Sequence, residues 1–444
     1  MKRPTNLRGF MVIWFGQVVS LLGSSMSMFA ITIWAWQLTG KATTLALVGL
    51  STYTTSIAFS PFAGALVDRW NRKLVMMLSD FGTALATIAL LLLYTTGNIQ
   101  IWHLYVIGIL AGGFRSFQYP AFTAAITMIV HKDHYARADA MIGVAESTVE
   151  IIAPMLAAVL LGPIGIVGIL LIDIATFGIA FVTLLWVPIS QPEQSAEEDR
   201  GPSNFWKDSA FGFRYIFRRP SLLALQLVFF GGNFFESLSL TILTPMILAR
   251  SNELVLGSVL SLGALGGVLG GLLMSLWGGP KRKIRAVMLG WIASNVFGVV
   301  VMGLGRGLFV WALANAIFAF LVPIVNGADQ AFWQSKVAPN VQGRVFSTRI
   351  MMIQLPSLIS MPLAGSLADY IFEPAMMPNG HLANAFGWLV GTGNGAGMSL
   401  MLILAGLAGT LIVLGGYGFR PVRNAEEILP DYDGRVASLA EVSV

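Results

Sequence analysis

The stretch Gly64–Lys73, GALVDRWNRK, decides the fold. Four of its ten positions are charged: Asp68, Arg69, Arg72 and Lys73. Elsewhere charge is scarce, because only 11% of the 444 residues are charged while 56% are hydrophobic, with a mean hydropathy of +0.74. A soluble protein needs more charge on its surface, whereas a bilayer accepts apolar side chains on every face of a helix. The composition therefore predicts an integral membrane protein and makes this stretch a loop between two spans.

The apolar runs predict an all-α fold of twelve transmembrane helices. Each run is close to the roughly 20 residues that a helix needs to cross the hydrocarbon core. The first is too long for a secretory signal peptide, so it is interpreted as a span. The predicted spans are residues 9–36, 44–67, 74–96, 101–130, 138–161, 164–187, 221–249, 255–278, 284–305, 308–335, 344–371 and 394–419.

The basic residues predict the orientation. With residue 1 in the cytoplasm, only four of the 27 Lys and Arg fall off the cytoplasmic segments: Lys41, Arg250 and Arg306 outside and Arg115 inside a span. Lys and Arg near span ends resist translocation, so we expect both termini in the cytoplasm. This asymmetry accounts for the net charge of +5 without a nucleic-acid partner.

A long polar segment divides the spans six and six. We expect an N-terminal six-helix bundle at 1–189, a cytoplasmic linker at 190–220 and a C-terminal bundle at 221–420. The second part of the linker mixes aromatic and basic side chains, which favours a helix lying in the membrane interface. A plain tether is the alternative. The residues at 421–444 are too polar to bury a core and are expected to form a mobile cytoplasmic tail.

Two landmarks recur at one spacing. Gly64 and Gly271 each open a similar charged loop, and Arg137 and Arg344 stand in similar segments, with 207 residues between the members of each pair. The halves are therefore expected to be duplicated six-helix units. Such halves are an architecture of secondary transporters, whose substrate site lies between them near the middle of the membrane.

Several segments carry a resemblance to a known family. GALVDRWNRKLVMMLSD, with a glycine, Asp-Arg four residues on and then Arg-Lys, resembles the loop signature of the major facilitator superfamily. FQYPAFTAAITMIV, GRVFSTRI and AGSLADYIFEPAM resemble its drug:proton antiporter branch, typified by bacterial macrolide exporters. The resemblance implies two pseudo-symmetric six-helix bundles and a multi-pass protein of the plasma (inner) membrane of a bacterium.

In the superfamily that the loop resembles, this signature acts as a cytoplasmic gate. The predicted gate residues are Gly64, Asp68, Arg69, Arg72 and Lys73. A carboxylate at the membrane edge can interact with the positive end of a helix from the other half, while the cations pair with carboxylates or helix ends. The alternative is that these charges only set the topology. The second half has Ser275 at the position corresponding to Asp68, so we expect the stronger latch in the first half.

Charges inside spans are costly, so each one is a functional candidate. Glu146 and Glu150 are four residues apart and share a helix face. Arg115 on the preceding span lies at a similar depth, so we expect it to pair with Glu150 or Glu146. Such a group is either a proton carrier or a permanent salt bridge between two helices, and both interpretations stay open. Asp173 lies in a peripheral span and is expected to be structural.

The second half supplies the remaining candidates. Glu236 stands among aromatic residues, which suits a lipophilic cation or a proton carrier; a buried acid in ordinary packing is the alternative. Asp329 either lines the cavity or pairs near the gate with Arg344 or Arg349. The predicted cavity residues, placed partly by the superfamily's use of spans one, four, seven and ten, are Gln17, Phe230, Asn233, Phe234, Asn326, Asp329 and Trp333.

Other classes of protein lack their motifs. There is no phosphate-binding GxxxxGK[ST] loop, no cysteine and no cluster of metal ligands, so neither an enzyme nor a cofactor is expected. The predicted function is a monomeric secondary active transporter that exports small amphipathic, drug-like compounds in exchange for protons by alternating access. The alternatives are transport of a lysophospholipid, a siderophore or another metabolite, and a non-transporting membrane sensor on the same fold.

Overall fold

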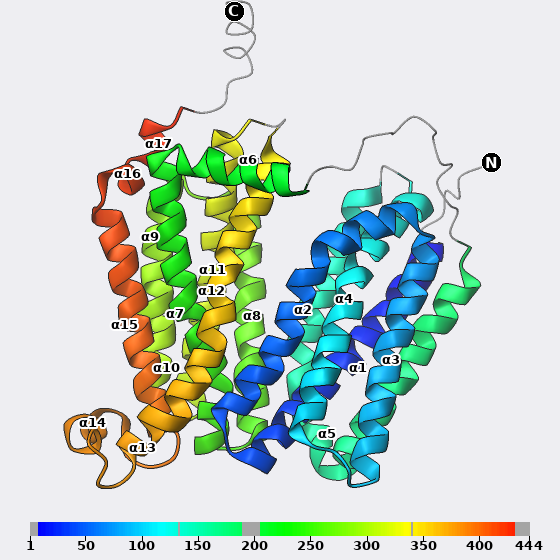
Figure 1. Cartoon of the computed structure of the whole chain (residues 1–444), viewed down its shortest axis with the longest axis horizontal. Coiled ribbons are helices and arrows are strands. Elements are labelled where there is room, and N and C mark those ends of the chain that lie inside the picture. Colours follow the sequence, from blue (N-terminus) through cyan, green and yellow to red (C-terminus); the bar gives the residue numbers. More distant parts are fainter. Residues whose placement is uncertain (1–7, 132–133, 189–204, 339–340, 431–444) are drawn as a thin grey trace, which may run out of the picture.

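The computed structural model describes residues 8–131, 134–188, 205–338 and 341–430, with the backbone alone at 60–62, 64–65, 68–69, 127, 136 and 205–210. Throughout these ranges the secondary structure is helical, and no strand occurs in them. The helices form two bundles, which we call the N half and the C half (Figure 1).

The N half contains five helical segments: α1 (Arg8–Thr39), α2 (Ala42–Arg69), α3 (Arg72–Thr95), α4 (Ile101–Ile129) and α5 (Tyr135–Trp186). The last of these is interrupted at Gly165, whose φ of 62° and ψ of −175° are not helical. Glycine adopts a positive φ without steric cost, so the chain reverses direction there. As a result, α5 covers the two spans expected at 138–161 and 164–187.

The C half follows the connecting helix α6 (Phe205–Phe217). Its long helices are α7 (Pro220–Arg250), α8 (Glu253–Trp277), α11 (Leu308–Lys336), α12 (Gln342–Leu367) and α15 (Ala396–Gly418). Two spans contain a π-helical segment. In one span, α9 (Lys283–Ala293) continues through η2 (Ser294–Val300) into α10 (Val301–Leu304). In the other, α12 continues through η3 (Ala368–Phe372) into α13 (Glu373–Met376). The short helices are α14 (Ala383–Val390), α16 (Arg420–Arg423) and α17 (Ala425–Ile428).

The predicted spans and the observed helices agree closely. Among the described residues, nine helical segments are long and apolar enough to cross a membrane. One of the nine is α5, which covers two predicted spans. The predicted spans at 44–67 and 101–130 correspond to α2 and α4, which are not among the nine. The all-α membrane fold is therefore confirmed, while the count of twelve spans stays a prediction.

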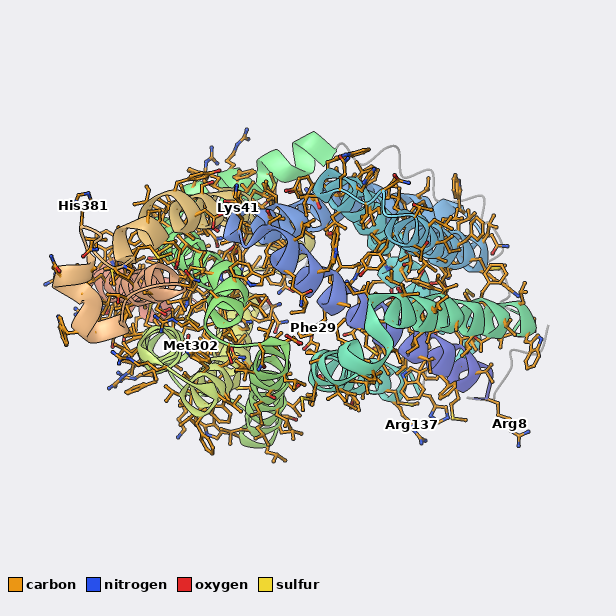
Figure 2. All side chains as sticks on the ribbon, turned by 90° about the horizontal axis from the view of Figure 1, so that it is seen from below. Arg8, Phe29, Lys41, Arg137, Met302 and His381 are labelled. Atoms are coloured by element: carbon orange, nitrogen blue, oxygen red, sulfur yellow. The ribbon has the colours of Figure 1, made fainter. Side chains whose placement is uncertain are left out.

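The two halves meet on one side of the molecule. We call the side that carries α6, α16 and α17 the α6 side and the opposite side, with α13 and α14, the α14 side. The bundles lie together near the α14 side and diverge toward the α6 side (Figure 1). Seen from the α14 side, Phe29 lies where the bundles meet, and Arg8 and His381 lie at opposite edges (Figure 2).

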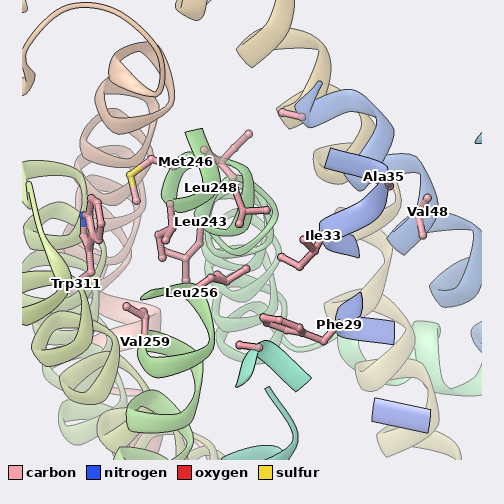
Figure 3. Packing of buried hydrophobic residues seen from close by; sticks show 14 of the residues in the cluster. Phe29, Ile33, Ala35, Val48, Leu243, Met246, Leu248, Leu256, Val259 and Trp311 are labelled. Atoms are coloured by element: carbon pink, nitrogen blue, oxygen red, sulfur yellow. The ribbon is translucent and has the colours of Figure 1, made fainter. Parts of the chain in front are cut away.

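The buried side chains follow the same division. The largest hydrophobic cluster joins both halves, and in it Phe29 and Ile33 of α1 lie near Leu248 and Leu256 of the C half (Figure 3). Toward the α6 side each half has a cluster of its own, exemplified by Met76 in the N half. Because apolar burial is shared only near the α14 side, the structure is the conformation closed on that side.

Two segments expected to be peripheral pack against the C half. On α6, Ile216 is fully buried, and Phe211 lies beneath the guanidinium of Arg344 with 5.1 Å from its Cζ to the ring centroid. The start of the expected mobile tail is folded, since Glu426 Oε1 accepts from the backbone N of Ile284 at 2.7 Å. Up to residue 430 the prediction of mobility is therefore wrong, because this segment binds the first turn of α9. Residues 431–444 lie outside the described part.

Candidate functional site

The N half encloses a cavity of about 370 Å³. Its walls come from α1, α2, α3, α4 and the second part of α5. The lining combines ten apolar side chains with thirteen polar ones, and the polar set includes two carboxyl groups, Asp80 and Asp173. Of the predicted cavity residues, Gln17 lies here.

Asp80 on α3 is the centre of a network that joins three helices. It is 6% exposed and accepts hydrogen bonds from Gln17 Nε2 at 3.0 Å and from Gln118 Nε2 at 2.9 Å. Gln118 Nε2 also donates to Gln17 Oε1 at 2.7 Å. Both hydrogen-bond partners of the carboxyl group are neutral amides, and no ion pair joins it to another described residue.

The sequence analysis missed Asp80 and Gln118. Asp80 is the last residue of the segment that resembles the loop signature, and it is absent from the predicted charges inside spans. The signal that was available is its distance from Arg72, where α3 begins: eight residues place it about 12 Å along the helix. A carboxyl group at that depth belongs with the charges inside spans.

Asp173 has a different environment in the same cavity. Its Oδ1 accepts from Ser24 Oγ at 3.2 Å and its Oδ2 from Thr87 Oγ1 at 3.1 Å, and the residue is 2% exposed. These bonds tie α5 to α1 and α3. The arrangement supports the structural role expected for Asp173.

A second cavity of about 160 Å³ lies beside the first and shares Gln17, Leu21, Arg115 and Gln118 with it. It is also lined by Glu146 of α5. Arg115 is exposed and forms no ion pair with Glu146 or Glu150, all three being described residues. The expected ion pair is therefore absent in this conformation, because Arg115 faces the solvent-accessible cavities and acts on Glu150 only at longer range.

Glu146 and Glu150 lie on α5, which crosses α8 of the C half. Four residues beyond Glu150, Pro154 is at the crossing with α8, where a Cβ on Gly257 would lie 2.8 Å from the Pro154 carbonyl oxygen. Residues four apart share a helix face. Glu150, four residues before Pro154, therefore lies on the face of α5 that turns toward α8, while Glu146, one turn earlier, lines the cavity of about 160 Å³.

The C half has a smaller cavity of about 190 Å³. It brings together four predicted residues from α7 and α11: Asn233, Glu236, Asn326 and Asp329. Glu236 accepts a hydrogen bond from Trp291 Nε1 at 3.1 Å. Asn233 Nδ2 donates to the carbonyl oxygen of Phe229 at 2.8 Å, so this amide is partly used within its own helix.

Asp329 both lines this cavity and forms an ion pair with Arg349 of α12, so one of the two expected partners is confirmed. Arg349 Nη1 donates to Gln330 Oε1 at 2.7 Å, and its Cζ lies 5.3 Å from the ring centroid of Trp333. Asp329 is 1% exposed, so the ion pair neutralises a charge that burial would otherwise penalise.

Three predicted cavity residues do not line either cavity. Phe234 packs against the cluster shared by both halves and against Phe235, with ring centroids 5.2 Å apart. Trp333 is buried beside Phe332 and Arg349. Phe230 is half-buried on α7. An aromatic residue in a span more often packs between helices than faces a cavity, and the sequence does not distinguish the two.

The predicted gate residues lie at the junction of α2 and α3. Arg72 Nη1 donates to the carbonyl oxygen of Ala124 at 3.0 Å, and Lys73 Nζ donates to Leu185 and Val187 carbonyl oxygens at 3.1 and 3.0 Å. Both cations therefore bind carbonyl oxygens within their own half, Lys73 at the end of α5 and Arg72 inside α4. Gly64, Asp68 and Arg69 are on α2, but their side chains lie outside the described part of the structure.

On the α14 side, a carboxylate connects the halves directly. Asp369 Oδ1 accepts from the backbone N of Ala42 at 2.9 Å, and Oδ2 accepts from the backbone N of Thr43 at 2.8 Å. The first turn of α2 has no helical acceptors for these groups, and its positive end favours an anion. This interaction is the one expected of Asp68, formed here by the C half on the other side of the molecule.

Comparisons with known proteins agree with this architecture. The chain is 27% identical over 374 residues to macrolide efflux protein A of Streptococcus pyogenes, covering 82% of this chain and 90% of that one. It is 23% identical over 373 residues to multidrug efflux pump Tap of Mycolicibacterium fortuitum, covering 81% and 89%. The crystal structure of the nucleoside transporter NupG superposes with a TM-score of 0.64 at 12% identity, covering 92% of this chain and 98% of that one.

The family itself follows from a match over most of the sequence. Residues 13–361 match the Major Facilitator Superfamily, and this range includes the charged loop, the three cavities and the contacts between the halves up to α12. The protein is a multi-pass membrane transporter and not an enzyme. With this match and its two helical bundles, the chain belongs to the Major Facilitator Superfamily.

Proposed function

We propose that this protein exports amphipathic, drug-like compounds across the bacterial plasma membrane in exchange for protons. The observation that carries the proposal is the position of Glu146 and Glu150. Both are exposed on α5, and Glu150 lies one turn before Pro154, where this helix crosses α8 at Gly257. Groups near this crossing change their surroundings when the halves rock, which is what a proton carrier requires.

The substrate class is supported by the relatives and by the cavities. The similar proteins are named for efflux of macrolides and of multiple drugs. In the chain itself, the cavities of both halves combine apolar side chains with carboxyl, amide and hydroxyl groups. A site of this composition suits a molecule with an apolar body and a polar or charged group.

The proposed cycle places the α6 side in the cytoplasm. The excess of Lys and Arg on that side supports this orientation. The conformation described here is then open inward and takes up substrate while Glu150, Glu146 or Glu236 is charged. Protonation from outside releases the substrate, and deprotonation inside restores affinity. Closure of the α6 side would engage Asp68, Arg69, Arg72 and Lys73, and a single chain suffices for this cycle.

The test is transport by purified protein in proteoliposomes. A proton gradient is imposed, internal pH is followed with an enclosed dye, and macrolides, cationic dyes and lysophospholipids are added in turn. We expect the drug-like compounds to trigger proton movement. Lipid movement that does not depend on the gradient would instead identify a lysophospholipid transporter.

Variants assign the carrier in the same assay. Glu146→Gln, Glu150→Gln and Glu236→Gln are made singly, with Glu427→Gln on the exposed surface of α17 as the matched control. We expect at least one of the first three to lose gradient-driven transport while the control keeps it. Unchanged transport in all three variants would show that none of these groups carries the proton.

A further inference from the structure

The cavity of the N half has the dimensions of a ligand site. Its volume of about 370 Å³ lies within the roughly 300–1,000 Å³ typical of small-molecule pockets. Leu21, Ile31, Leu104 and Phe177 are among its apolar wall residues. An inorganic ion would leave most of this space and surface unused, so the walls favour an organic ligand.

The charge of the cavity favours a cationic ligand. Each oxygen of Asp80 accepts one hydrogen bond from a neutral amide, and a buried carboxylate without a counter-ion carries a desolvation penalty. Beside it, Gln118 Oε1 is buried and accepts no hydrogen bond. The carboxylate and this free acceptor together offer what a protonated amine requires.

The other charged groups around the cavity do not supply the missing cation. Asp173 is a second carboxyl group and, like Asp80, accepts one hydrogen bond on each oxygen, in its case from the hydroxyls of Ser24 and Thr87. Arg115, the cation among the lining residues, is exposed and forms no ion pair with the described carboxylates of this half. In the C half, the buried carboxyl group of Asp329 has a counter-ion within the protein, because it pairs with Arg349.

We propose that the N-half cavity binds the protonated amine or onium group of an amphipathic substrate, with Asp80 as the counter-ion and the apolar walls holding the attached carbon skeleton. In identifying the ligand as the transported compound, the inference rests on the proposed function. The adjacent cavity of about 160 Å³ gives a route, since it shares Arg115 and Gln118 with this one and reaches Glu146 on α5.

Binding of tetraphenylphosphonium to the purified full-length protein in detergent tests the site without transport. Equilibrium dialysis with the labelled cation measures the Kd of the wild type, Asp80→Asn and Asp173→Asn. We expect Asp80→Asn to weaken binding about tenfold or more, because one charge-assisted contact is lost. Asp173→Asn makes the same chemical change in the same cavity and should stay within about twofold, because the free acceptor Gln118 Oε1 lies beside Asp80 and not beside Asp173.

A second measurement does not depend on removing Asp80. The chain has no cysteine, so Thr83→Cys places a single thiol in the cavity wall. Tetraphenylphosphonium should slow alkylation of this thiol by N-ethylmaleimide, with half-protection near its measured Kd. The uncharged triphenylphosphine oxide should protect at least about tenfold less well, since it lacks the charge that Asp80 attracts.

The outcomes separate the two proposals. Equal binding by wild type and Asp80→Asn, or no protection of the Thr83→Cys thiol at saturating tetraphenylphosphonium, would overturn the cation site. If gradient-driven export of the cation nevertheless continues in Asp80→Asn, the site falls and the proposed function stands. If tetraphenylphosphonium binds and protects as expected but no compound moves protons, the cation site stands and the proposed function fails.

Discussion

Removing the charge of Asp369 should release the closed α14 side. This carboxylate of the C half accepts hydrogen bonds from the first turn of α2 in the N half, from Ala42 N at 2.9 Å and Thr43 N at 2.8 Å. In Asp369→Asn one oxygen can still accept, while the new amide group faces a backbone donor. The variant therefore loses one charge-assisted hydrogen bond and the attraction between a negative charge and the positive helix end.

The size of the effect follows from the half-buried position of Asp369. A hydrogen bond to a charged group contributes about 1.5–3 kcal/mol and a helix-end charge about 0.3–1 kcal/mol, and the two overlap because they describe one contact. A shift of about 1–3 kcal/mol changes the equilibrium between two conformations by roughly 5–150-fold. The contact exists only while the α14 side is closed, so the variant should populate the conformation open on that side.

Distances between spin labels measure this population. Because the chain has no cysteine, Asn98→Cys and His381→Cys place one label on the exposed α14 side of each half. We expect Asp369→Asn to transfer a measurable fraction of the distance distribution to longer values.

Glu373→Gln is the matched control for this experiment. Glu373 accepts from Gly395 N at 2.9 Å and Met398 N at 2.8 Å, at the start of α15 within its own half. Its loss should lower stability without changing the distance between the halves. An unchanged distribution in Asp369→Asn, or an equal shift in both variants, would refute the latch.

Three further predictions concern contacts in the rest of the structure. Arg349→Met should lower the unfolding temperature in a thermal melt, because removing one partner of a buried ion pair typically costs about 3–5 kcal/mol. The double variant Arg349→Met, Asp329→Asn should recover part of this loss of stability. If the losses of the two single variants simply add, the pairing is contradicted. Gly257→Ala should shift the same spin-label distances toward the form open on the α14 side, because the added Cβ would lie 2.8 Å from the Pro154 carbonyl oxygen. Gly271→Ala on the same helix is the control, because a Cβ added there would have no atom within 4 Å. A chain ending at Asn424 should unfold at a lower temperature than one ending at Pro430. Only the longer chain keeps two hydrogen bonds of Glu426: its carboxylate accepts from Ile284 N, and its backbone carbonyl oxygen accepts from Lys336 Nζ at 2.7 Å. Equal unfolding temperatures would show that α17 does not stabilise α9.

The predicted cavity residues of the C half fall into two groups, polar and aromatic. Asn233, Glu236, Asn326 and Asp329 are brought together in the C half, since each is a polar residue in an apolar helix and must find a polar environment. Phe230, Phe234 and Trp333 line neither cavity, because an apolar ring is equally stable against any neighbouring helix. Polar residues inside spans were thus informative about the site, and aromatic residues were not.

The amino-acid sequence by itself determined the membrane class, the order of the helices and their ends to within a few residues. Apolar length and loop charge decide these features locally, as at the charged junction of Asp68 and Lys73. Only the tertiary structure decided which groups meet: Asp80 with two glutamines, Arg349 with Asp329, and Asp369 with the first turn of α2. Those contacts join helices far apart in the sequence, and in a chain whose helices are apolar on every face, hydropathy does not tell which face turns toward which neighbour.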